Sequence, residues 1–112
     1  SVDLHDAGVW LRARAAPECV EYVVANRDIA YWLHLAVMGN PRAADRTSAL
    51  DAYTANAAVG RWVEGTSLPF AIAHRRLLPA GLAGDVTTIH TVGGAVIISR
   101  PLRPGDPVCR AR

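Results

Sequence analysis

The sequence predicts an α+β fold in which three or four N-terminal helices pack on a small antiparallel sheet with a C-terminal β-hairpin. Apolar residues at helical spacing predict the helices, and two β-branched runs separated by two glycines predict the hairpin. At 112 residues, with 51% hydrophobic and 20% charged residues, the chain has the size and apolar content of one globular domain. We therefore expect one domain over 1–112, helical over 1–58 and mainly β over 59–112.

Two helices are expected in the first third of the chain. The first begins at Asp3, a good N-cap residue, and carries apolar residues including Leu4, Val9, Trp10, Leu11 and Ala13. The second begins at Pro17, which suits the first turn of a helix, and ends before Gly39. It is apolar on all sides over 29–38, a pattern typical of a buried helix, and Asp28 could cap a separate second piece.

The middle of the chain leaves two interpretations open. A third helix is expected from Asp45 or Thr47 to Ala58. Beyond it, the pattern fits two strands joined at Gly65, or a helix ending at Gly65 and another beginning at Pro69. We favour a strand over 68–78 because its apolar residues alternate.

The last third predicts a β-hairpin. The β-branched runs 86–92 and 95–100 flank Gly93-Gly94, and glycine tolerates the positive φ values of tight hairpin turns. The tail that follows contains the turn residues Pro104-Gly105-Asp106 and could form one more short strand over 108–112.

Charge permits several kinds of partner. All 12 basic residues are arginines, the formal net charge is +2, and the arginines are scattered apart from Arg75-Arg76 and a group near the end, Arg100, Arg103, Arg110 and Arg112. The planar guanidinium binds carboxylates and phosphates in bidentate fashion. Nucleic-acid binding is therefore permitted but not required.

Cys19 and Cys109 match no zinc spacing, and we expect two free thiols, since a disulfide would require an oxidising compartment. Cys19 could formally act as a nucleophile with His90 as its base, although a buried structural thiol is favoured.

No apolar stretch reaches the roughly 18 residues of a membrane helix, and no basic leader precedes an apolar run. We expect a cytoplasmic protein that does not enter the membrane, with no cofactor or metal, because no phosphate loop, dinucleotide fingerprint or paired-histidine motif is present.

His74 and His90 are the candidate catalytic residues. If their strands are neighbours, both side chains could reach one face, with Arg75 and Arg76 nearby. Histidine transfers protons near neutral pH and arginine binds anions, so this group suits an acyl- or carboxylate-bearing substrate. Trp62 completes the predicted substrate-binding residues. His34, on an apolar helix, is interpreted as a core or interface histidine.

Two segments resemble known families. Residues 71–74 (Ala-Ile-Ala-His) and 101–108 (Pro-Leu-Arg-Pro-Gly-Asp-Pro-Val) resemble the latter part of hotdog-fold acyl-thioester hydratases and thioesterases. That resemblance implies an acyl-thioester substrate, and in the family the second phrase leads from one sheet strand into the next. Residues 59–69 resemble the end of the recognition helix in repressor-type helix-turn-helix domains, which implies that Asn56 and Arg61 contact DNA and that the hairpin serves as a wing.

Three functions therefore stand open. The first is a small-molecule binding domain or small enzyme that uses histidine acid/base chemistry and arginine anion binding. The second is a DNA-binding transcriptional regulator. The third is a non-catalytic protein-interaction subunit, whose apolar helix over 29–38 could bury against a copy of itself in a homodimer.

Overall fold

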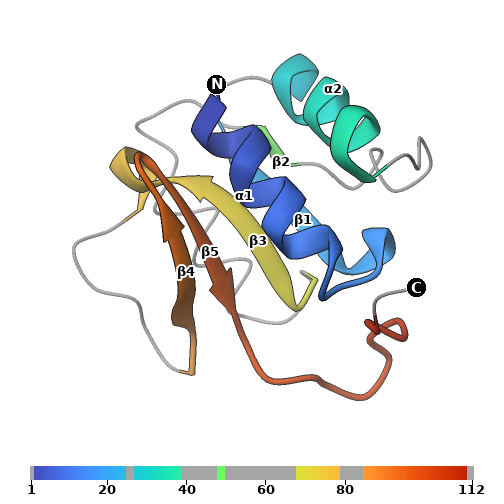
Figure 1. Cartoon of the computed structure of the whole chain (residues 1–112). Helices are drawn as coiled ribbons and strands as arrows, with labels where there is room; N and C mark the ends of the chain where they lie inside the picture. The colour runs from blue at the N-terminus through green and yellow to red at the C-terminus, as the bar shows by residue number, and fades with distance from the viewer. Residues whose placement is uncertain (1, 25–26, 39–47, 50–67, 79–84, 111–112) are drawn as a thin grey trace.

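The structure is a computed structural model that describes residues 2–24, 27–38, 48–49, 68–78 and 85–110. Its elements, in chain order, are α1 (Val2–Arg12), the 3-10 helix η1 (Pro17–Cys19), β1 (Val20–Val24), α2 (Arg27–Met38), β2 (Ser48–Ala49), β3 (Phe70–His74), the 3-10 helix η3 (Arg75–Leu77), β4 (Thr87–Val92) and β5 (Ala95–Ser99). Figure 1 shows α1 lying along one face of the sheet, with α2 beside it.

The strands form one mixed sheet in the order β2-β1-β3-β5-β4. β1 pairs in parallel with both β2 and β3, whereas the β3–β5 and β4–β5 pairs are antiparallel. The predicted fold class is therefore wrong in two respects: the described chain has two α-helices rather than three or four, and its sheet is mixed rather than antiparallel. The coarser prediction, one domain that combines helices with a sheet, is confirmed.

The strand β1 explains most of this error. Val20, Val23 and Val24 recur at helical spacing, a pattern that predicts that they belong to the second helix. In the structure Val20 and Val24 join the core on the α1 face of the sheet, and Val23 joins the core on the opposite face. A parallel strand buried on both faces lacks polar alternation, so its sequence looks like that of a buried helix. The break foreseen near Asp28 is confirmed, because α2 begins at Arg27.

The remaining middle predictions have mixed outcomes. Ser48 and Ala49 form β2 rather than part of a third helix, and the rest of that predicted helix lies outside the described residues. So does 59–67. The strand favoured over 68–78 is confirmed at Phe70–His74, and the chain then turns into η3. The final strand expected over 108–112 is reduced, within the described residues, to a single antiparallel bridge between Ala15 and Arg110.

The N-terminal helix and the hairpin are both confirmed, and one side chain joins them. Gly93 has φ +53° at the hairpin turn, the left-handed region that favours glycine. The backbone N–H of Gly94 donates a hydrogen bond to the carboxylate of Asp3, with an N···O distance of 2.9 Å. Asp3 lies inside the first turn of α1 rather than before it, so it anchors the helix to the hairpin.

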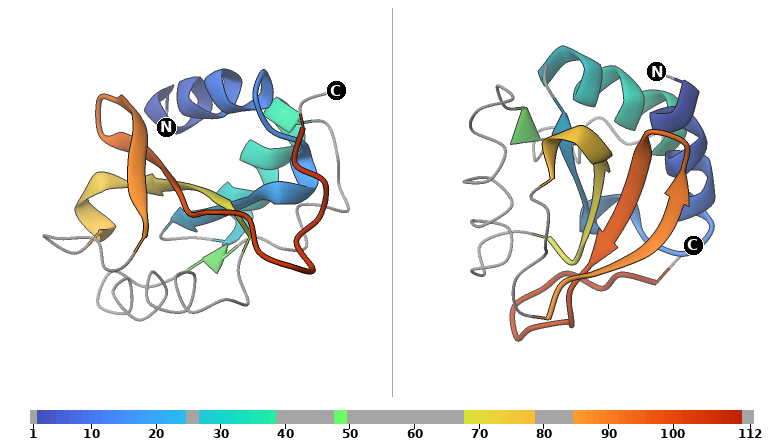
Figure 2. Two further views of the ribbon diagram at one scale, coloured as in Figure 1. Left: turned by 90° about the horizontal axis from the view of Figure 1, so that it is seen from below. Right: turned by 90° about the vertical axis from the view of Figure 1, so that its left-hand side faces the viewer.

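The core has a cluster on each face of the sheet. On the helix side, α1 and α2 pack their apolar residues against β1, β3 and β5; the buried members are Leu4, Ala7, Leu11, Ala15, Val20, Tyr22, Val24, Leu33, Val37, Ile72, Ala95 and Ile97. The opposite cluster contains Val23, Ala71, Ala73, Val86, Val96 and Ile98. Neither described helix is long and apolar enough to cross a membrane. Figure 2 shows the tail after β5 returning to the C-terminal end of α1.

Candidate functional site

The two candidate catalytic histidines share a face of the sheet but not a cleft. His74 lies opposite Ala95 of β5, and His90 of β4 lies opposite Ile97 of the same strand. Paired residues, and residues two positions apart on a strand, share a face, so both histidines lie on the α1 side. β5 runs between them, and its Ala95 and Ile97 are completely buried there. β3 and β4 are thus not neighbours, and the structure does not bring the predicted catalytic pair together.

His74 keeps part of its predicted surroundings. Partial burial, followed by the charge of Arg76, lowers the pKa of His74 below the usual 6.5, while Asp3 acts in the opposite direction. Arg75 and Arg76 are exposed in η3, and the backbone N–H of Arg75 donates to the carbonyl of Gly94 at 2.8 Å. The lowered pKa favours neutral imidazole at pH 7, the form that can accept a proton.

His90 belongs to a different group of residues. Its ring stacks on Trp10 of α1, with ring centroids 4.1 Å apart and an interplanar angle of 6°. The guanidinium carbon of Arg14 lies 3.9 Å from the centroid of the same indole, and Arg14 Nη1 donates to the carbonyl of Trp10 at 2.8 Å. His90 and Trp10 therefore hold Arg14 in place just beyond the C-terminal end of α1. The predicted residues Trp62, Asn56 and Arg61 lie outside the described part of the chain.

His34 is a core histidine, as one of the two interpretations held. It is completely buried, and its Nδ1 lies 2.6 Å from the hydroxyl oxygen of Tyr22 in a hydrogen bond. Burial raises the pKa of Tyr22 well above the usual 10.

The helix α2 is not buried on all sides. Its residues Ile29 and Trp32 are 42% and 65% exposed, so that expectation is wrong. The homodimer stays a prediction.

The cysteines are joined, contrary to expectation. Cys19 and Cys109 form a disulfide across 90 residues of sequence, with their Cα atoms 5.5 Å apart. The prediction of two free thiols is wrong, and Cys19 has no thiol that could act as a nucleophile with His90. The pairing depends on the tail returning to η1, which no local pattern reveals.

The described residues form a groove at the tail, and neither predicted histidine is among its described lining residues. It measures about 670 Å³ and lies between the tail, the start of β3 and the region after α1. The described lining residues are Arg14, Pro69, Phe70, Ser99, Arg100, Pro101, Leu102, Arg103, Asp106, Pro107, Val108, Cys109 and Arg110. Four of them are arginines and one is an aspartate, a formal charge of +3 where the whole sequence carries only +2. Such a groove suits an anion.

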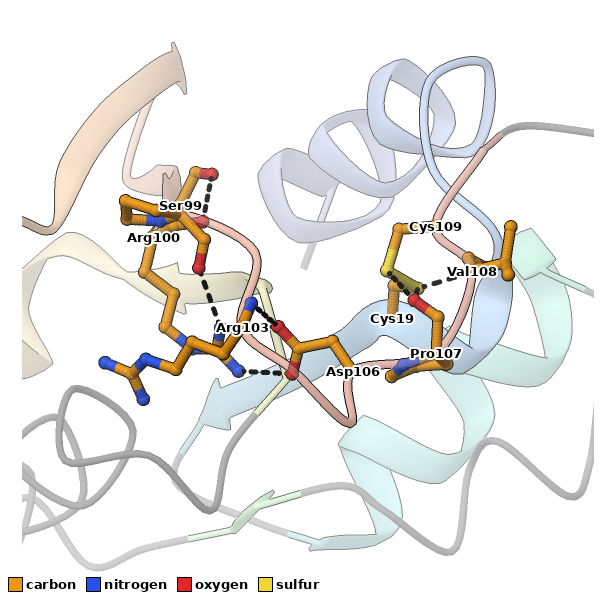
Figure 3. The surroundings of a disulfide bond; sticks show 9 residues. Cys19, Ser99, Arg100, Arg103, Asp106, Pro107, Val108 and Cys109 are labelled. Atoms are coloured by element: carbon orange, nitrogen blue, oxygen red, sulfur yellow. Dashed lines mark hydrogen bonds and ion pairs between the residues drawn. A yellow bond between two sulfur atoms is a disulfide. The ribbon is translucent and has the colours of Figure 1, made fainter.

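An ion pair shapes the near end of this groove. The side chain of Arg100 is completely buried, and its Nη1 and Nη2 donate to the two carboxylate oxygens of Asp106, each at 2.9 Å. The backbone N–H of Arg103 donates to the same carboxylate at 2.6 Å. The hydrogen bond from Arg100 in particular lowers the pKa of Asp106 to about 2. Figure 3 shows this pair at one end of the tail and the disulfide at the other.

Two features of the sequence pointed to this site. One was the arginine group near the chain end, and the other was the Pro104-Gly105-Asp106 turn, which the structure confirms with φ +91° at Gly105 and a hydrogen bond from the N–H of Asp106 to the carbonyl of Arg103. Neither sign revealed that Arg14 joins the group from the other end of the chain. In the described portion, no three His, Cys, Asp or Glu residues gather closely enough to hold a metal ion.

Comparisons with known proteins add no identification. No family model, no curated protein and no solved structure matches this chain. The resemblances to hotdog-fold enzymes and to helix-turn-helix domains therefore stay predictions.

Proposed function

We propose that this domain binds a small anionic ligand, a carboxylate or acyl compound with an apolar part, in the groove at the tail. The observation that carries the proposal is that three arginines, Arg14, Arg103 and Arg110, line one groove of about 670 Å³ in addition to the Arg100–Asp106 pair. A volume in this range is typical of small-molecule sites. The ligand class is the one that the sequence favoured, but the proposed site is the tail groove rather than the surroundings of His74 and His90.

The exposed arginines are the residues that would meet the ligand. Arg100 is committed to Asp106 and supports the wall of the groove. Arg14 and Arg110 are exposed, and they come from opposite ends of the chain. A guanidinium has five N–H donors, so Arg14 retains donors beyond the one that contacts the carbonyl of Trp10. Together, Arg14 and Arg110 could clamp one carboxylate.

The apolar lining supports a ligand with a hydrocarbon part. Phe70 is half-buried at the start of β3, and Leu102 and Val108 are 67% and 80% exposed on the tail. A carboxylate alone would leave these side chains in water, whereas an aromatic or acyl group would cover them. His74 and His90 are absent from the described lining, so acid/base catalysis is not part of this proposal.

Titration calorimetry with three probes of known charge tests the proposal. Phenylacetate joins a carboxylate to a phenyl ring through a methylene group, phenethylamine joins an ammonium group to the same ring through an ethylene chain, and sulfate carries negative charge without an apolar part. We expect phenylacetate to bind more tightly than sulfate and phenethylamine not to bind. Arg14→Gln and Arg110→Gln should each weaken phenylacetate by about fivefold, near 1 kcal/mol for an exposed charge contact.

Arg75→Gln is the matched control, because Arg75 is an exposed arginine outside the groove. Its affinity for phenylacetate should equal that of the wild type. Equal binding of phenylacetate and phenethylamine, or an equal loss in Arg75→Gln, would refute the groove as an anion site. Tight binding of a short DNA duplex that weakens steeply with salt would instead favour the DNA-binding alternative.

A further inference from the structure

We infer that the disulfide between Cys19 and Cys109 is a redox switch that holds the anion groove together. Its reduction releases the far wall of the groove, Val108 to Arg110, and lowers ligand affinity. This inference rests on the proposed function, since it concerns the regulation of the same groove. The position of the bond, the weakness of the other contacts of the far tail and the partial exposure of Cys109 each support it.

The disulfide lies where the tail meets the body of the domain. Cys19 is completely buried at the end of η1, immediately before β1, and Cys109 is itself one of the lining residues. Val108 and Arg110, on either side of Cys109, also line the groove. The bond therefore fixes Val108, Cys109 and Arg110, the far wall of the groove, to the start of β1 (Figure 3).

The two ends of the tail are held in different ways. The near end keeps the bidentate pair between Arg100 and Asp106, which does not involve the cysteines. At the far end, Ala16 donates its N–H to the carbonyl of Cys109 at 3.3 Å, and Arg110 makes the bridge to Ala15. No residue of 101–110 is buried, so little apolar area holds this stretch in place once the covalent bond is broken.

The chemistry is ordinary thiol–disulfide exchange with a dithiol as reductant. Cys109 is partly exposed whereas Cys19 is buried, so the reductant thiolate attacks Sγ of Cys109 and Cys19 leaves as a thiolate. The second thiol of the reductant then displaces Cys109 from the mixed disulfide. Two electrons pass to the protein, both cysteines become thiols after taking up protons, and the reductant is left as a disulfide.

Binding and reduction are reciprocally coupled through the far wall. If reduction leaves the tail in its binding position for about one tenth of the time, the apparent dissociation constant rises about tenfold. By linkage, a ligand that bridges Arg14 and Arg110 shifts the thiol–disulfide equilibrium towards the disulfide by the same factor. Compartments rich in dithiols would then hold the domain in its low-affinity form.

The test compares oxidised and dithiothreitol-reduced protein in phenylacetate titrations, with circular dichroism recorded on each sample. We expect reduction to weaken phenylacetate binding by at least about tenfold while the helix and sheet signals remain, and reoxidation to restore the affinity. Cys19→Ala/Cys109→Ala is the matched control, and it should bind weakly whether or not dithiothreitol is present. In a thiol–disulfide redox buffer, saturating phenylacetate should also raise the ratio of oxidised to reduced wild-type protein by about tenfold.

Each other outcome overturns a distinct statement. Equal affinity before and after reduction would remove the switch and leave the anion groove intact. Unfolding of the domain on reduction would show that the disulfide holds the whole fold rather than the groove, and would also refute the switch. Failure of the oxidised protein to bind phenylacetate would refute the proposed function itself.

Discussion

Replacing Asp106 by Asn should destabilise the domain far more than the loss of an ordinary surface charge. The change removes the negative charge that faces the completely buried side chain of Arg100, and the new amide can accept only one of the two guanidinium hydrogen bonds at 2.9 Å. Breaking a buried ion pair by removing one partner typically costs about 3–5 kcal/mol. Because Arg100 Nη1 also donates to the carbonyl of Pro101 at 3.0 Å, we expect the lower end, about 3 kcal/mol.

Urea unfolding at pH 7 measures this cost. With a slope of about 2 kcal/mol per molar urea, the midpoint should fall by about 1.5 M. Asp85→Asn is the control, because Asp85 is exposed and its loss should change the free energy of unfolding by less than about 0.5 kcal/mol. A loss below about 1 kcal/mol in Asp106→Asn would mean that the pair behaves as a surface salt bridge, and the reasoning from burial would fail.

The same pair makes a prediction about acid. The pKa of Asp106 is lowered to about 2 from the usual 3.8, so the unfolded chain binds this proton at higher pH than the folded chain does. The contribution of the pair is therefore complete above pH 3.8 and is lost as the pH falls towards 2. The stability difference between wild type and Asp106→Asn should shrink over that interval, and a constant difference would contradict the assignment.

Two further predictions concern the hairpin and His74. Gly93→Ala should lower the free energy of unfolding in urea by about 1–3 kcal/mol, because Gly93 has a positive φ and its new Cβ would lie 2.6 Å from the Asp3 carboxylate. In the control Gly94→Ala the Cβ would lie 3.6 Å from that carboxylate, so the free energy of unfolding should hardly change. Equal losses in the two variants would contradict the proposed strain. His74 has a lowered pKa, so the unfolded chain gains its proton first as the pH falls below about 6.5, and the folded state loses stability there. Melting temperatures from pH 8 to 5 should consequently fall more in wild type than in His74→Gln, and parallel curves would contradict this.

Local signals predicted the elements that local chemistry determines. The Gly93-Gly94 turn, α1 and the break before α2 follow from turn residues, periodicity and capping, and the structure has all three. The strand β1 could not be recognised in this way, because burial on both faces removes the alternation by which strands are read. A parallel partner far along the chain decides its conformation.

The candidate site was harder to predict for a related reason. The sequence showed that His74 and His90 lie in strands, and their registers do put them on one face. It did not show that β5 enters between β3 and β4, which is what separates them. The tail groove needs Arg14 and Cys19 beside residues 100–110. Contacts between residues about 90 positions apart produce no local sequence pattern from which they could be predicted.

The attachment of α1 to the C-terminal hairpin affects the order in which the core can form while the chain is synthesised. Asp3 contacts Gly94, and Leu4, Ala7 and Leu11 share a core with Ala95 and Ile97. While the ribosome is still translating the middle of the chain, the apolar side of the first helix has no β5 to cover it. The helix can pack against α2 and β1 earlier, but its core with Ala95 and Ile97 is completed only after residue 99 has been synthesised. During that interval, the apolar residues of α1 that face β5 in the folded domain lack this partner.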